Sequence, residues 1–231
     1  MRTFLTASIA LLALAAPAGA ATRNFGITGF EKIRIEGPYK ITLATGVAPF
    51  ARASGSSAAL DRIAIEVRGS TLVVHNNLSS WGSDPAKAAG QVEISLGTHD
   101  LRAASLSGAG TLAINRIKGL SFDLSSQGSG AVEVGRADVD QLNVSVIGTA
   151  SAVLAGRAGK LTAVVRGVSS LDASGLAAKD ASLVGEGAAT IGANVTNAIT
   201  IDGSGPVAVT LAGRPACTLR LNGSASVTGC R

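Results

Sequence analysis

Three charged residues occupy the same place in a phrase that recurs along the second half of the chain. Arg166, Glu186 and Asp202 each come directly before a glycine. If the repeats stack, their side chains form one column, with two carboxylates above each other and the arginine one coil earlier. Glycoside hydrolases use paired carboxylates, so this column is the best polar candidate for binding a cation or a sugar. The competing interpretation is a surface charge ladder, and we assign no catalytic residue.

The second candidate is Trp81, which lies in a polar segment, residues 76–90, with Asn77 and Asp84 close by. A Trp in a polar loop can stack on a sugar ring or fill a pocket of a partner. It can equally fold down and cover the end of the domain as a buried cap. Both interpretations stay open, and Trp81, Asn77 and Asp84 join the charged column as candidate ligand-binding residues.

Other catalytic chemistry is poorly represented. The two histidines are His75 and His99. The sequence contains no G-x-S-x-G nucleophile motif that could complete a triad with His99-Asp100, so this pair is interpreted as part of a solvated turn. The glycine-rich segments complete neither the dinucleotide motif nor a P-loop. We therefore expect no metal site and no cofactor.

The element that positions these residues is a repeat of about twenty residues. Short apolar runs flank a glycine in each copy, and the anchoring glycines are Gly108, Gly128, Gly148, Gly167, Gly187, Gly203 and Gly223. A fixed period in this range predicts coils that stack on a shared core. The expected fold is all-β: a single parallel β-helix, or β-solenoid, with right-handed coils. Glycine is expected at each corner because the chain bends sharply there and neighbouring coils approach closely.

The region before the repeat alternates between apolar and polar residues. Ile33 and Ile35, then Ile41 and Leu43, face one way and predict two half-buried strands separated by a turn. We expect residues 21–100 to supply N-terminal strands and the long loop, forming a β cap, and residues 101–231 to form the coils.

The first twenty residues have a basic start, an apolar core and small residues before Ala21, which is the pattern of a secretory signal. The mature domain is therefore expected to span residues 21–231, without a membrane span. Cys217 and Cys230 are the two cysteines, and an oxidising compartment favours a disulfide between them. Two buried thiols are the alternative. The net charge of +5 is scattered and aromatic residues make up 3% of the chain, so nucleic-acid binding is not expected.

Three segments carry a family resemblance. They read Gly29-Phe-Glu-Lys-Ile-Arg-Ile-Glu-Gly-Pro-Tyr-Lys-Ile-Thr-Leu43, Gly69-Ser-Thr-Leu-Val-Val74 and His99-Asp-Leu-Arg-Ala-Ala-Ser-Leu-Ser-Gly-Ala-Gly110. Their order and spacing resemble the putative auto-transporter adhesin head domain, also called the GIN domain or DUF2807. The resemblance implies an exported bacterial β-helical protein of the periplasm or cell surface. It brings no catalytic or ligand residues that could be carried over to this chain.

The function favoured by the sequence is a non-enzymatic envelope protein that presents a rigid surface for adhesion, with a glycan or an envelope protein as the expected partner. One alternative is a carbohydrate-active β-helix enzyme, such as a polysaccharide lyase or hydrolase. Another is a structural module that associates with copies of itself into a homo-oligomer.

Overall fold

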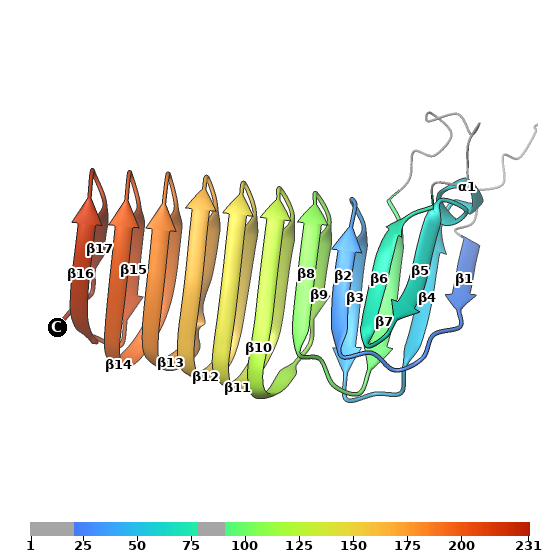
Figure 1. Cartoon of the computed structure of the whole chain (residues 1–231), viewed down its shortest axis with the longest axis horizontal. Coiled ribbons are helices and arrows are strands. Elements are labelled where there is room, and N and C mark those ends of the chain that lie inside the picture. The colour runs from blue at the N-terminus through green and yellow to red at the C-terminus, as the bar shows by residue number, and fades with distance from the viewer. Residues whose placement is uncertain (1–20, 78–90) are drawn as a thin grey trace, which may run out of the picture.

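The computed structural model describes residues 21–77 and 91–231. The expected β-solenoid is confirmed: parallel strands stack in coils of roughly 20 residues along one axis (Figure 1). The strands that precede the repeat, with one helical turn, are β1 (Ala21–Phe25), β2 (Lys32–Glu36), β3 (Lys40–Thr45), β4 (Phe50–Gly55), α1 (Ser57–Leu60), β5 (Ile63–Arg68), β6 (Thr71–Asn76) and β7 (Glu93–Thr98). Those of the repeat are β8 (Ala103–Gly108), β9 (Thr111–Ile114), β10 (Ile117–Gly128), β11 (Ala131–Gly148), β12 (Ser151–Gly167), β13 (Ser170–Glu186), β14 (Thr190–Ser204), β15 (Ala208–Ala212), β16 (Ala216–Asn222) and β17 (Ser226–Thr228).

The core is a narrow column of small branched side chains. In β11, Val132, Val134, Leu142 and Val144 point inward, and each is at most 3% exposed. The side chains between them point outward, as the two-residue period of a strand requires. Phe122 is the largest fully buried side chain. Where neighbouring coils pair in register, each inward apolar residue lies between inward residues of the coils above and below.

The corners depend on glycine because the backbones of successive coils touch there. Six of the seven expected corner glycines have positive φ, namely Gly108, Gly128, Gly148, Gly167, Gly187 and Gly223. A Cβ on Gly128 would lie 2.8 Å from the carbonyl oxygen of Gly108. The steric freedom of glycine is therefore needed twice, for the left-handed backbone and for the close approach.

The expectation for Gly203 was wrong. Gly205, with φ +89°, stands at the corner beside Gly187, whereas Gly203 pairs with Gly185 inside the strands and is buried. A Cβ at Gly203 would meet the side chains of Leu221 and Ala225. The phrase offers two glycines, and the β13–β14 register shifts earlier in the coil decide which one reaches the corner.

The solenoid begins earlier in the chain than the expected boundary at residue 101. Strands β2 and β3 do not form a hairpin; they pair in parallel with β8 and β9 on one side and with β6 and β7 on the other. The end of the column is covered by antiparallel strands: β5 pairs with β6, β4 with β7, and β1 with β4. The expected cap thus consists of β1, β4, β5 and α1, at the right of Figure 1.

A disulfide links Cys217 to Cys230 and ties β16 to the residues that follow β17. Cys217 pairs with Ile199 of the coil below and packs against the core. Two neighbours in this last coil, Leu219 and Leu221, are 43% and 38% exposed although the register directs them inward, since no described strand lies above them. The disulfide therefore holds the coil that has the least packing around it.

Candidate binding surface

A groove of about 730 Å³ crosses the outer face of the sheet made by β6, β2, β8 and the C-terminal halves of β10, β11 and β12. It runs across these strands and hence along the solenoid axis. Several outward-facing residues at this place are small, such as Ala103, Ser105 and Ser125.

The strand register defines that column. Arg34 pairs with Ser105, which pairs with Ser125, which pairs with Ser145, and Ser145 pairs with Val164. Because strands lie about 4.8 Å apart, the three serines place one hydroxyl on each of three successive coils. Arg34 and Val164 rise at the two ends of this serine column.

Amide and carboxylate groups border the serine column. Asp123 and Asn143 lie two residues before Ser125 and Ser145 and pair with each other. The Nδ2 group of Asn143 donates a hydrogen bond to Oδ1 of Asp123 at 2.8 Å. Lys32, on β2 at the same end of the groove as Arg34, has no ion-pair partner among the described residues. The groove therefore offers hydroxyl, amide and charged groups above a floor of apolar atoms. Such a surface can hydrogen-bond a linear polar ligand laid along the axis.

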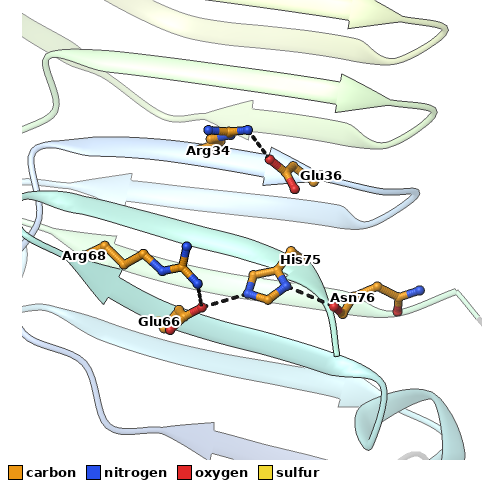
Figure 2. Close-up of polar contacts among 6 residues, drawn as sticks. All are labelled: Arg34, Glu36, Glu66, Arg68, His75 and Asn76. Atoms are coloured by element: carbon orange, nitrogen blue, oxygen red, sulfur yellow. Dashed lines mark hydrogen bonds and ion pairs between the residues drawn. The ribbon is translucent and has the colours of Figure 1, made fainter. Parts of the chain in front are cut away.

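A charged cluster adjoins the groove at Arg34 and Thr71, which line both the groove and a smaller hollow beside it. Figure 2 shows this cluster on β2, β5 and β6. Arg34 pairs with Glu36 at 2.5 Å. On the next strands, Arg68 donates to Glu66 at 2.6 Å, and Glu66 contacts Nε2 of the His75 ring at 2.8 Å.

Both ring nitrogens of His75 face hydrogen-bond acceptors. Nε2 contacts the Glu66 carboxylate and Nδ1 lies 2.9 Å from the carbonyl oxygen of Asn76, an arrangement that favours the protonated ring. The hydrogen bond to Glu66, followed by the one to the Asn76 carbonyl, raises the pKa of His75 above its ordinary 6.5. Conversely, the hydrogen bonds from His75 and then Arg68 lower the pKa of Glu66. In the protonated ring both nitrogens donate, and this form has no free lone pair to act as a base.

The structure brings together two of the three charged residues expected in one column. Arg166 and Glu186 pair in register, and their side chains form a salt bridge of 3.0 Å between Nε and Oε2. Asp202 does not stack on Glu186: it pairs with Val184 below and with Arg220 above, at 3.7 Å from the guanidinium. The shift has the same cause as that at Gly203, the shortened coil between β13 and β14. No acid pair is formed by these residues.

The second set of expected binding residues falls mostly outside the described part of the chain. Trp81 and Asp84 are not among the described residues. Asn77 is described, and its backbone N–H donates to the carbonyl of Arg62 at 2.7 Å. Within residues 21–77 and 91–231, no group of three or more His, Cys, Asp or Glu side chains could hold a metal ion. None of the helices described there is long and apolar enough to cross a membrane.

Sequence reasoning missed the serine column and the His75 cluster. Ser105, Ser125 and Ser145 recur at steps of twenty residues, so a search for small outward residues at a fixed place in the repeat could have found them. In the His75 cluster, Glu66, Arg68 and His75 lie on the consecutive antiparallel strands β5 and β6, so a predicted hairpin could have suggested their contact. The placement of β2 beside β6 had no such signal, because these strands pair out of chain order.

The family model described as "Putative auto-transporter adhesin, head GIN domain" matches residues 29–215. No curated protein matches the chain. A solved structure of a putative adhesin from Bacteroides fragilis is 21% identical, with a TM-score of 0.77, and the match covers 90% of this chain and 96% of that one.

Two further solved structures come from the genus Parabacteroides. A putative lipid binding protein from P. distasonis is 16% identical, with a TM-score of 0.69, and the match covers 91% of this chain and 96% of that one. A putative adhesin from P. merdae is also 16% identical, with a TM-score of 0.68 and the same coverage. At these identities the likeness shows a shared fold.

Proposed function

The chain belongs to the GIN domain family of putative auto-transporter adhesin heads, and we propose that it is an exported, non-enzymatic binding protein of the cell envelope that holds a linear glycan in its groove. The observation that carries this proposal is the serine column, Ser105, Ser125 and Ser145, with one hydroxyl on each of three successive coils. The named role of the family and the disulfide, which is typical of oxidising compartments, support export and a binding role.

A glycan suits the groove because its chemistry repeats along its length. Each sugar presents hydroxyl groups and a patch of C–H bonds, and the groove presents serine hydroxyls beside apolar groups of outward-facing residues such as Ala103, Thr162 and Val164. Asp123 and Asn143 add an acceptor and a donor beside the column. One of the structural relatives is named a lipid binding protein, but an acyl chain favours an enclosed pocket of branched apolar side chains, and this groove is open.

The charged residues favour binding over catalysis. Both nitrogens of His75 are engaged in hydrogen bonds, and Glu186 is neutralised by Arg166. Hydrolysis by a carboxylate pair needs two acids that flank one bond, and the register separates Glu186 from Asp202. We therefore favour adhesion over the lyase or hydrolase alternative.

The test is binding of the purified protein to an array of linear oligosaccharides and acyl lipids, with a variant that fills the groove. Ser125→Tyr places a ring in the middle of the serine column, and tyrosine is well accepted in strands. We expect the variant to lose at least about tenfold in affinity for a glycan that the unmodified protein binds, since it displaces contacts of at least one coil.

Ser170→Tyr is the matched control, because Ser170 is exposed on β13 outside the groove. It should bind like the unmodified protein. Equal affinity of Ser125→Tyr and the unmodified protein, or binding of acyl lipids alone, would overturn the proposal. Trp81 remains a separate expectation: a Trp81→Ala variant that loses the same glycan would extend the binding surface to residues 76–90.

A further inference from the structure

Another hollow, of about 520 Å³, lies at the bend in the middle of the long strands β10, β11 and β12. In β11 this bend falls between Val134 and Ala137, where the pairing with β12 shifts its register. The bends lie along the lower edge of the solenoid in Figure 1, opposite the arrowheads of β10 to β14. No residue that lines this hollow lines the groove, so the two sites are independent.

Four cationic side chains line the hollow: Arg116, Lys118, Arg136 and Arg157. The register explains why they meet. Lys118, Asp138 and Arg157 occupy one column on three successive strands, while Arg116 and Arg136 each come directly before the paired residues Ile117 and Ala137. With strands about 4.8 Å apart, repeats of the same place in the coil bring these charges side by side.

The charges in the hollow are unbalanced. Asp138 is the one acid that lines it, and it pairs with Arg157 at 3.2 Å. Arg116, Lys118 and Arg136 have no ion-pair partner among residues 21–77 and 91–231. Several exposed arginines elsewhere in the described chain do have one, as Arg166 has Glu186 and Arg102 has Glu31. Holding three unpaired cations together costs electrostatic free energy, which a bound anion would offset.

We propose that this basic hollow binds a phosphate group. Guanidinium groups present planar forks of N–H donors that match phosphate oxygens, and lysine adds a compact charge. The charge of the hollow exceeds what one carboxylate can neutralise, because three cations lack partners, and a phosphate monoester carries up to two negative charges. The phosphate can belong to a soluble phosphorylated sugar or to a lipid headgroup, and the two sources are separated by experiment.

The measurement is the affinity of the purified protein for glucose 1-phosphate and for glucose, by titration calorimetry at low salt. A parallel sedimentation assay compares vesicles of phosphatidylglycerol with vesicles of phosphatidylcholine. We expect glucose 1-phosphate to bind at least about tenfold more tightly than glucose, or the anionic vesicles at least about tenfold more tightly than the zwitterionic ones, since hydrogen bonds between charged groups are the strong ones. Binding of the sugar phosphate alone identifies a soluble source, and preferential binding of the anionic vesicles identifies a lipid headgroup.

Two pairs of variants make the test specific for the hollow. Lys118→Gln with Arg136→Gln removes two of its cations and should weaken phosphate binding at least about tenfold. Lys160→Gln with Arg231→Gln changes the net charge equally at exposed positions outside the hollow and should leave binding unchanged. Asp138→Asn removes the one acid of the hollow and frees Arg157, so it should tighten binding.

Three results would overturn the proposal. The first is equal binding of glucose 1-phosphate and glucose together with equal binding of the anionic and the zwitterionic vesicles. The second is an equal loss of affinity in the two double variants, which would mean that only net charge matters. The third is a double variant, Lys118→Gln with Arg136→Gln, that folds with unchanged circular dichroism and binds the phosphate as tightly as the unmodified protein.

Discussion

The carbonyl oxygen of Gly128 lies 2.5 Å from the point where a Cβ on Gly148 would stand. No real side chain tolerates that distance, so these two glycines bring the backbones of neighbouring coils into direct contact. The contact is used: the N–H of Thr149 donates to the Gly128 carbonyl at 2.8 Å. The corner is therefore a hydrogen-bonded backbone ladder that an added methyl group would separate.

We expect Gly148→Ala to lower the free energy of unfolding by more than the roughly 1–3 kcal/mol of backbone strain alone, because it adds a clash to the positive φ. Gly69→Ala is the control: Gly69 also has positive φ, but a Cβ there would meet nothing within 4 Å. It should cost about 1 kcal/mol. Urea titrations of both variants measure the difference, and equal losses would contradict the backbone-contact explanation.

Ser126 has a buried hydroxyl without a hydrogen-bond partner among the described residues. It points inward between Leu106 and Val146. Removing an unsatisfied buried hydroxyl relieves a desolvation cost, so Ser126→Ala should raise the free energy of unfolding by about 1 kcal/mol. Ser125→Ala, on the outward side of the same strand, should change it by less than about 0.5 kcal/mol. A Ser126→Ala variant less stable than the unmodified protein would show that the hydroxyl does find a partner.

Both partners of the ion pair between His75 and Glu66 should make the free energy of unfolding depend on pH. The raised pKa of His75 means that its contribution is complete below about pH 6.5 and is lost as the pH rises through the pKa of the folded state. The lowered pKa of Glu66 means that its contribution is present above about pH 4.5 and is lost as the pH falls through its folded value. Between these limits the pair is intact.

We therefore expect the imidazole of His75 to titrate above pH 6.5 by NMR, and Glu66→Gln to move that midpoint downward. The control is Glu93→Gln, which removes the partner of Lys40 instead. A midpoint of His75 that is the same in Glu66→Gln and in the unmodified protein would show that the pair is not formed.

Replacing both Cys217 and Cys230 by serine should destabilise the protein locally. Cross-linking a loop of this size stabilises by roughly 3 kcal/mol in the chain-entropy model. Because each coil of a solenoid contacts only its neighbours, amide exchange should accelerate in β16 and β17 while β11 keeps its protection. Hydrogen exchange with mass spectrometry tests this, and uniform acceleration along the column would argue that the coils unfold as one unit.

The site shows how far the repeat alone can be extrapolated. Arg166 and Glu186 were predicted to be neighbours and are, because the pairing of β12 with β13 has no register shift between Ala155 and Arg166. Asp202 was predicted to join them and does not, because the β13–β14 pairing skips residues earlier in the coil. Alignment on glycines works while coils have equal length, and it fails in the first coil that is shortened.

The sequence by itself determined the coil and most of its corners, and it favoured the disulfide. A strand repeats every two residues and a coil about every twenty, so inward side chains and most corner glycines can be read from local periodicity. Only the tertiary structure placed β2 between β6 and β8, and so brought Arg34 to the end of the serine column. Pairing between distant segments depends on which apolar faces pack together. This packing produces no repeating pattern in the sequence from which it could be predicted.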